Sequence, residues 1–204
     1  MLNYVAFGAR QATPCTGFSA VSQRLMDPDN RGFTLWFTGL PCAGKSTLAR
    51  MVAEELGRRG IRCEILDGDE VRQHLSRGLG YSKEDRDENI RRIGFVCGLL
   101  SRHGVAAIVA AISPYRAARD QVRSAVGTFV EVQVQTPVEI CAQRDPRGLY
   151  KKAFRGQLKN FTGVNDPYEP PLNPELVVDA GHESAKVCTG QVIACLERLG
   201  LVRR

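Results

Sequence analysis

The chain has 204 residues, which suffice for one well-buried domain and leave little for a second. Its 43% hydrophobic and 25% charged residues are typical of a soluble globular protein, and no apolar stretch approaches the roughly 20 residues of a membrane span. The seven cysteines form no Cys-x-x-Cys pair and are odd in number, which argues against a disulfide framework and favours a reducing, cytoplasmic location. The net charge of +6 predicts anionic partners, either phosphorylated or sulfated small molecules or nucleic acid.

Residues 1–30 differ in character from the rest of the chain. They contain Ser, Thr, Gly, Pro and Gln, with no acidic residue before Asp27. They also lack the apolar run of about 7–15 residues that a secretory signal carries. We interpret them as a mobile N-terminal extension that precedes one folded domain, residues 31–204.

The first element of that domain leads into a glycine-rich loop. Residues 33–37 form an apolar run that predicts a buried strand, and Leu48, Val52 and Leu56 recur every four residues and predict a helix from about Lys45. Between them a G-x-x-x-x-G-K-[ST] motif reads Gly39-Leu40-Pro41-Cys42-Ala43-Gly44-Lys45-Ser46-Thr47. Such a loop at a helix N-terminus binds anions through backbone N–H groups and the helix dipole. The motif predicts a nucleoside-triphosphate site, with Lys45 at the β- and γ-phosphates and Ser46 on Mg²⁺.

Strand and helix signals alternate through the rest of the chain. Further strands are predicted at residues 62–66, 105–112, 129–134 and 176–178. The continuous apolar run 105–112 is typical of a central parallel strand. This alternation predicts an α/β fold of the P-loop nucleoside-triphosphate-binding type, a three-layer αβα doubly wound parallel sheet with helices on both faces.

Three helix starts carry N-cap signals. Ser82 with Asp85 resembles a capping box that opens a helix through Leu100. Ser113 followed by Pro114 predicts an N-cap and a first helical proline. Thr136, followed by a proline and then Glu139, predicts another N-cap. A closing helix places four apolar residues on one face: Cys188, Val192, Cys195 and Leu199.

The periodic pattern fails between Pro146 and Pro174, where glycine, proline and lysine dominate. A stretch this long without periodicity in a compact domain is usually a functional lid. Residues 141–160 carry six Lys or Arg against one acid, Asp145. This excess predicts either an electrostatic funnel or a solvated basic face.

A candidate acceptor site follows the second strand. Asp67, Asp69 and Arg72 lie within six residues of one another, and the carboxyl ends of parallel strands border the crevice that the glycine loop faces. One carboxylate can take the proton of an acceptor hydroxyl while another anchors the water shell of the metal. The alternative is an Asp-Gly turn with a surface ion pair.

Seven blocks, in order and covering about residues 32–180, resemble the adenylylsulfate kinase (APS kinase) family. They are residues 36–40 with the P-loop, 66–72, 79–82, 85–93, 112–116, 144–152 and 161–169. The resemblance implies that the domain uses MgATP to phosphorylate the ribose 3′-hydroxyl of adenosine 5′-phosphosulfate (APS), giving ADP and 3′-phosphoadenylyl sulfate for sulfate assimilation. It also implies a homodimer and a lid at approximately residues 144–172.

The same resemblance implies roles for individual residues. Asp69 would be the base or orienting carboxylate at the 3′-hydroxyl, with Lys45 and Ser113 completing the catalytic set, and Asp67 would support the Mg²⁺ shell. The other implied substrate contacts are Arg72, Arg86 and Asn89 at the phosphosulfate and sugar, Tyr81 and Phe161 around the adenine, Ile112 beside Ser113, Arg144 at the ATP adenine, and Arg147 and Lys151 in the lid. For Ser113 we favour substrate contact plus capping over an obligatory phosphoserine intermediate.

Two other functions compete with this interpretation. Another small-molecule P-loop kinase, of the gluconate or nucleoside type, gives no reason for Tyr81 and Phe161 to bracket a base. A nucleotide-binding regulatory or nucleic-acid-binding module predicts steeply salt-dependent binding to polynucleotides and has no need for the Asp67 and Asp69 pair. We therefore expect ATP and APS as small-molecule partners, and neither nucleic acid nor membrane.

Overall fold

Five parallel strands form one sheet in the order β2-β3-β1-β4-β5. The computed structural model describes residues 32–203, so the extension predicted at residues 1–30 lies outside the described residues. The strands are β1 (Thr34–Thr38), β2 (Cys63–Asp67), β3 (Ala106–Ala110), β4 (Phe129–Gln135) and β5 (Leu176–Asp179). β1 lies at the centre, where Leu35 is in register with Ile108 of β3 and Val130 of β4. The predicted parallel sheet is confirmed.

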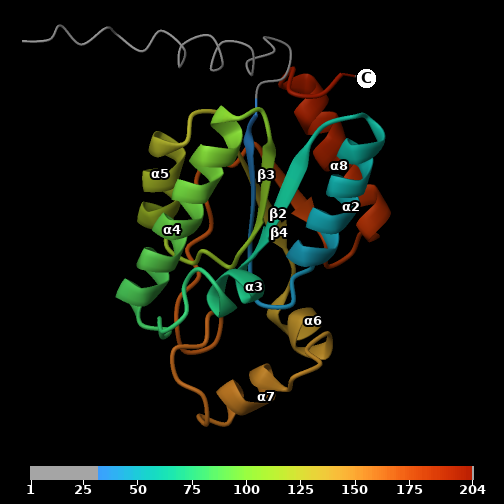
Figure 1. Cartoon of the computed structure of the whole chain (residues 1–204). Helices are drawn as coiled ribbons and strands as arrows, with labels where there is room; N and C mark the ends of the chain where they lie inside the picture. The colour runs from blue at the N-terminus through green and yellow to red at the C-terminus, as the bar shows by residue number, and fades with distance from the viewer. Residues whose placement is uncertain (1–31, 204) are drawn as a thin grey trace, which may run out of the picture.

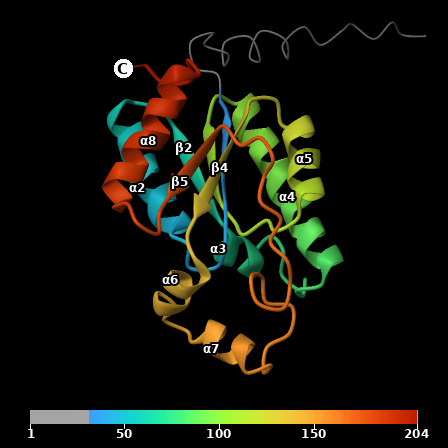
Figure 2. The ribbon, with the colours of Figure 1, turned by 180° about the vertical axis from the view of Figure 1, so that it is seen from behind.

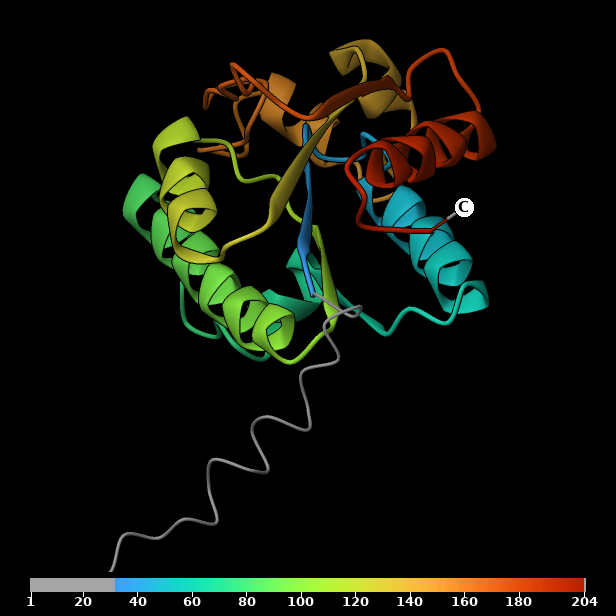
Figure 3. The ribbon, with the colours of Figure 1, turned by 90° about the horizontal axis from the view of Figure 1, so that it is seen from above.

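Helices cover both faces of this sheet (Figure 3). They are α2 (Lys45–Arg58), α3 (Gly68–Gln73), α4 (Lys83–Arg102), α5 (Arg116–Ala125), α6 (Val138–Gln143), α7 (Leu149–Phe154) and α8 (Ala185–Arg198). α2 and α8 pack on one face, and α4 and α5 on the other. Because successive strand side chains point to opposite faces, Leu35 and Phe37 join the core under α2 and α8 while Trp36 joins the core under α4 and α5.

The short helices gather at one end of the sheet. β1 runs toward the end of the sheet where α3, α6 and α7 lie (Figures 1 and 2). All five strands are parallel, so every strand presents its carboxyl end there. Residues from separate parts of the chain therefore meet at this end, and α7 lies inside the stretch predicted to be a lid.

Several predicted helix boundaries are confirmed. α2 begins at Lys45, and the Ser82 hydroxyl accepts a hydrogen bond from the Asp85 N–H at 3.2 Å to cap α4. The capping box is not reciprocal, because the Asp85 carboxylate instead accepts from the Gly80 N–H at 3.0 Å.

Two predicted caps are wrong. α5 begins at Arg116 with Tyr115 as its N-cap, and the Ser113 side chain is buried against Trp36 and Thr38. α6 has Pro137 as its N-cap, because the Thr136 hydroxyl donates to the carbonyl of Ala43 at 3.0 Å instead. Both hydroxyls find partners on other elements, which local sequence does not reveal. In the closing helix Cys188, Val192 and Cys195 are buried as predicted, whereas Leu199 ends the helix and is 44% exposed.

Candidate active site

The glycine loop after β1 has a conformation that its glycines make possible. Gly39 has φ +153°, and a Cβ there would lie 2.5 Å from the carbonyl oxygen of Val134. Gly44, the N-cap of α2, has φ +106°, which L residues rarely adopt. The loop therefore passes close against β4 and enters α2 directly.

Lys45, the first residue of α2, lies buried within this loop. Its Nζ donates to the carbonyls of Gly39 and Leu40 at 2.9 and 2.7 Å. Burial lowers the pKa of Lys45 to about 8, against the opposing effect of nearby groups that include the carboxylates of Asp67 and Asp69. The amine is thus held inside the glycine loop by two backbone carbonyls.

The end of β2 is tied to the start of α2. The Ser46 hydroxyl donates to Asp67 Oδ2 at 2.5 Å, and Asp67 Oδ1 accepts from the Asp69 N–H at 3.0 Å, capping α3. Asp69 lies two residues further on, in the first turn of α3, and its carboxylate contributes to the electrostatic environment of Lys45 and Cys42. The hydrogen bond from Ser46 thus brings the end of β2, at Asp67, against the glycine loop.

The predicted lid contacts both halves of this arrangement. Arg147 Nη2 lies 2.9 Å from Asp69 Oδ2, with the two side chains 66% and 68% exposed. The buried Tyr150, on α7, donates its hydroxyl to the carbonyl of Pro41 at 3.0 Å. The predicted lid thus contacts the glycine loop through Tyr150 and the Asp69 carboxylate through Arg147. The exposed Lys151 is the next residue of α7.

A cavity of about 410 Å³ opens beside the loop. It is lined by Cys42, Gly44, Lys45, Ser46, Thr47, Leu48, Arg144, Ala180, Glu183 and Ala185. Arg144 is held there by a 2.9 Å hydrogen bond from its Nη2 to the carbonyl of Ala180. The structure thus brings Arg144 to the glycine loop as predicted, whereas Gly39, Leu40, Pro41 and Ala43 belong to the loop without lining this cavity.

Sequence reasoning missed the wall that Ala180, Glu183 and Ala185 contribute. These residues follow β5 and begin α8. Their position after the last predicted strand could have identified them, because the carboxyl ends of parallel strands lie at the same edge of the sheet.

A second group of predicted residues surrounds the start of α4. Arg72 Nη1 donates to the carbonyl of Gly80 at 2.8 Å, and its guanidinium lies 4.6 Å from the centre of the Tyr81 ring. Arg86 is buried, donates to the carbonyls of Tyr81 and Asn160 at 3.0 and 2.5 Å, and lies 5.6 Å from the same ring. Two cations therefore flank one exposed aromatic ring.

Asn89 and Phe161 complete this end of the site. Asn89 is buried, and its Oδ1 has no hydrogen-bond partner among the described residues. Phe161 is 8% exposed and meets Tyr150 edge-on at 4.8 Å, whereas Tyr81 is 60% exposed. Within residues 32–203 no ring contact joins Tyr81 to Phe161.

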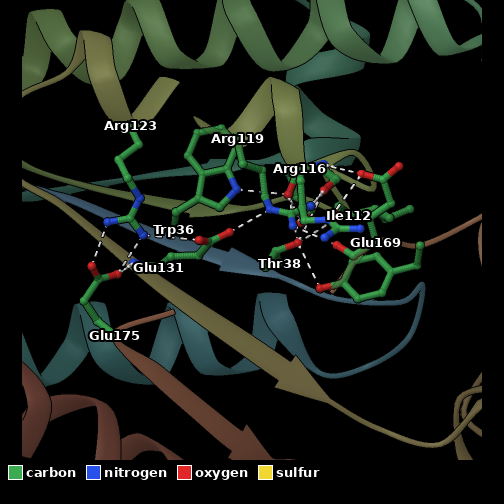
Figure 4. Close-up of polar contacts among 12 residues, drawn as sticks. Trp36, Thr38, Ile112, Arg116, Arg119, Arg123, Glu131, Glu169 and Glu175 are labelled. Carbon is green, nitrogen blue, oxygen red and sulfur yellow. Dashed lines mark hydrogen bonds and ion pairs between the residues drawn. The ribbon is translucent and has the colours of Figure 1, made fainter. Parts of the chain in front are cut away.

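Ile112 and Ser113 follow the carboxyl end of β3. The Ser113 hydroxyl accepts from Trp36 Nε1 at 3.0 Å and donates to Thr38 Oγ1 at 3.0 Å, while Thr38 donates to the carbonyl of Ile112 at 2.8 Å. Figure 4 shows these contacts. The Ser113 side chain is therefore buried and its hydroxyl is already committed.

The fold and site define a P-loop phosphotransferase: a phosphate-binding loop after the central strand, carboxylates where the second strand of the chain ends, and a segment around α7 that contacts both. Residues 31–179 match the sequence model described as adenylylsulphate kinase. The chain belongs to this family, and the match decides against the gluconate- or nucleoside-type kinase and the non-enzymatic binding module.

Individual relatives agree with the family assignment. The chain is 54% identical over 173 residues to an adenylyl-sulfate kinase of Gloeothece citriformis, covering 85% of this chain and 98% of that one. It is 56% identical over 173 residues to a probable bifunctional SAT/APS kinase of Sorangium cellulosum, but spans only 30% of that longer protein. The solved Mycobacterium tuberculosis APS kinase CysC, in complex with AMPPNP and APS, has a TM-score of 0.78 and 42% identity, covering 82% of this chain and 98% of its own. Among the helices within residues 32–203, none combines the length and apolarity that crossing a bilayer requires.

Proposed function

We propose that this chain transfers the γ-phosphoryl group of ATP to the ribose 3′-hydroxyl of APS, releasing ADP and 3′-phosphoadenylyl sulfate in sulfate assimilation. The observation that carries the proposal is the contact between the glycine loop and the end of β2, where Asp67 bonds Ser46 and Asp69 follows in the first turn of α3. ATP bound in the cavity beside the loop would place its terminal phosphate between Lys45 and Asp69. Family membership supports the choice of acceptor.

The donor half is suited to MgATP. The Ser46 hydroxyl and the Asp67 carboxylate, 2.5 Å apart, are the hard oxygen donors that Mg²⁺ accepts along with waters and phosphate oxygens. Ser46 would bind the ion, Asp67 would hold its water shell, and the bound ion would neutralise charge on the β- and γ-phosphates. Gly39–Thr47 would supply backbone N–H groups, and Arg144 would lie against the adenine.

Asp69 is placed to act on the acceptor hydroxyl. It lies in the first turn of α3, and within residues 32–203 its side chain pairs with the exposed Arg147. A carboxylate there can orient the 3′-hydroxyl and take its proton as the phosphoryl group arrives. Arg147 would move from Asp69 to the phosphates as substrates bind, and Lys151 would join it in the closed lid, which keeps water from the transferring group.

The acceptor half is suited to a nucleotide anion. Arg72 and Arg86 can bind phosphosulfate oxygens through their guanidinium forks. The unpartnered Oδ1 of Asn89 is an acceptor left for a substrate donor. Tyr81 and Phe161 would bracket the adenine, and stacking of this kind contributes about 1–3 kcal/mol per base.

Ile112 and Ser113 would shape the floor under the substrate. The committed hydroxyl of Ser113 supports a positioning role over a phosphoserine intermediate, since phosphorylation would require leaving Trp36 and Thr38. Transfer of radiolabel from ATP to Ser113 at the rate of turnover would contradict this role. We further propose that the protein is a cytoplasmic homodimer in which residues 1–30 form an extension and residues 144–172 the lid.

A coupled ADP-release assay tests the function. The purified chain is given MgATP with APS, gluconate or a nucleoside as acceptor. We expect turnover with APS and formation of 3′-phosphoadenylyl sulfate, identified by chromatography. Turnover confined to gluconate or nucleosides would overturn the proposal.

A further inference from the structure

A buried cation that the proposed mechanism leaves unused, Arg119, donates to the Ser113 carbonyl; Figure 4 shows Arg119 among its neighbours. Arg119, on α5, is 1% exposed, and its three nitrogen atoms find three different partners. Nε pairs with the Glu131 carboxylate at 2.6 Å, while Nη1 donates to the Ser113 carbonyl at 2.5 Å and Nη2 to the Glu169 carbonyl at 2.7 Å. Because a buried charge is costly unless paired and hydrogen-bonded, Glu131 makes the guanidinium tolerable. The same guanidinium holds the carbonyls of Ser113 and Glu169 in place.

Those carbonyls belong to two distant segments of the chain. Ser113 follows β3, and Glu169 lies near the end of the predicted lid. The two segments touch again where the Glu169 N–H donates to the Pro114 carbonyl at 2.8 Å and the Glu169 carboxylate accepts from the Arg116 N–H at 2.9 Å. Arg119 therefore lies at the centre of a junction between the end of the lid and the turn at residues 112–114.

The same junction reaches the start of the glycine loop. The hydroxyl of Tyr168, the residue before Glu169, lies 3.2 Å from Thr38 Oγ1. Thr38 directly precedes Gly39 and also donates to the Ile112 carbonyl. One contiguous set of hydrogen bonds thus connects the lid, the turn and the loop.

The turn itself needs such support. Ser113 has φ +42°, a left-handed conformation that is costly for a residue with a side chain and persists only where its surroundings hold it. Trp36 and Thr38 hold the Ser113 side chain, and Arg119 holds its carbonyl. Without the guanidinium, the Ser113 carbonyl would lose its charged donor and the backbone would be free to relax.

We propose that Arg119 is a positioning residue for the acceptor substrate: it fixes the backbone of Ile112 and Ser113 and anchors the end of the lid against it. This inference rests on the proposed function, in which Ile112 and Ser113 contact APS. None of the three partners of Arg119 lines the cavity assigned to ATP. Its loss therefore impairs use of APS and leaves ATP binding intact.

Arg123 supplies a matched control. It lies one turn further along α5 and pairs with the same Glu131 at 3.2 Å and with Glu175 at 2.6 Å. Among its recorded bonds, none reaches Ser113 or Glu169. Arg119→Lys and Arg123→Lys therefore weaken the same buried ion network, and only the first removes the forked bonds to the turn and the lid.

The experiment measures kcat and the KM values for APS and ATP, with the melting temperature, for both variants. We expect Arg119→Lys to lower kcat/KM for APS on the order of tenfold or more while the KM for ATP stays within about twofold. Arg123→Lys should keep APS kinetics near wild type whatever its loss of stability. Equal APS kinetics in Arg119→Lys and wild type, or the same APS defect in Arg123→Lys, would overturn the proposal.

A double variant covers the case in which Arg119→Lys does not fold. Arg119→Met with Glu131→Met removes both buried charges together, and replacing a buried pair by apolar side chains is often neutral for stability. Arg123 keeps Glu175 in this background. We expect the same loss with APS; wild-type APS kinetics in the folded double variant, or failure of both variants to fold, would overturn the positioning role.

The wild-type assay separates the two levels of inference. If the unmodified chain does not phosphorylate APS, the proposed function fails and this inference fails with it. If it does, and Arg119→Lys behaves as wild type, the positioning role fails alone.

Discussion

The two halves of the active site are built in different ways. The donor half comes largely from one continuous segment, Gly39–Thr47, whose loop and helix N-terminus already enclose Lys45 beside a cavity. The proposed acceptor half is assembled from α3, α4, the turn after β3 and the predicted lid. Within residues 32–203 its Asn89 Oδ1 has no hydrogen-bond partner, and its Asp69, Tyr81 and Arg147 side chains are exposed. The difference shows that the phosphate-binding loop is formed locally, whereas the opposite wall of its cavity and the proposed acceptor site depend on distant segments being held together.

Removing the cation of the donor half should have the largest effect. We expect Lys45→Met to lower kcat by on the order of 10³-fold, because a buried charge at the transferring phosphate is lost where the dielectric is low. Steady-state ADP release with APS measures this loss. Lys186→Met, an exposed lysine of α8, is the control; comparable losses in both variants would contradict a specific role for Lys45.

Removing the Asp69 carboxylate should have the next largest effect on kcat. Asp69→Asn is expected to lower kcat by on the order of 10²-fold or more, since the amide cannot accept the proton of the 3′-hydroxyl. ATP affinity, measured by calorimetry, should survive. Glu70→Gln changes the exposed neighbouring carboxylate on α3 and should leave kcat near wild type. Wild-type turnover in Asp69→Asn would remove Asp69 from its role.

The affinity for ATP should depend on pH through the Lys45 amine. Burial holds the pKa of Lys45 at about 8 in the free protein, and triphosphate binding should raise it by supplying a counter-charge. Above that pH the amine must take up a proton when ATP binds, so affinity should approach a tenfold loss per pH unit. Calorimetry at pH 8.5 in two buffers of different ionisation enthalpy measures the uptake. Lys45→Met should abolish it, and uptake that persists in this variant would assign the proton elsewhere.

The same pKa shift also makes the free energy of unfolding depend on pH. Because the pKa of Lys45 is lower in the folded protein than its ordinary 10.5, the unfolded chain binds the extra proton between about pH 8 and 10.5. The Lys45 contribution therefore raises the free energy of unfolding as pH increases through this window.

The contact between lid and carboxylate should have the smallest effect. An exposed ion pair such as Arg147 with Asp69 contributes about 0–1 kcal/mol, so Arg147→Met should lower the free energy of unfolding by no more than this. A loss of kcat/KM for APS would then come from the proposed contact of Arg147 with the phosphates, and unchanged kcat/KM would remove Arg147 from the closed lid. Arg155→Met, an exposed residue just after α7, is the control, and ADP release with and without APS separates lid closure from chemistry.

The role of a residue could be predicted from the sequence where its hydrogen-bond partner lies nearby in the chain. The Ser82 cap was predictable because its donor, the Asp85 N–H, is three residues away. The caps assigned to Ser113 and Thr136 were wrong because their hydroxyls bind Thr38 and the Ala43 carbonyl across the sheet. The residues after β5 that line the cavity were missed for the same reason, since they carry no motif of their own.

The sequence by itself determined the parallel α/β fold, the glycine loop with Lys45 and Ser46, and the carboxylate pair at the end of β2. All of these follow from short-range patterns: apolar runs, glycines at required backbone angles and residues directly after strands. Only the tertiary structure decided that Arg147 contacts Asp69, that Tyr150 fastens the lid to Pro41, and that Arg119 joins Ser113 to Glu169. Each of these contacts brings together segments tens of positions apart, and no local propensity specifies them, because packing of the whole chain selects each partner.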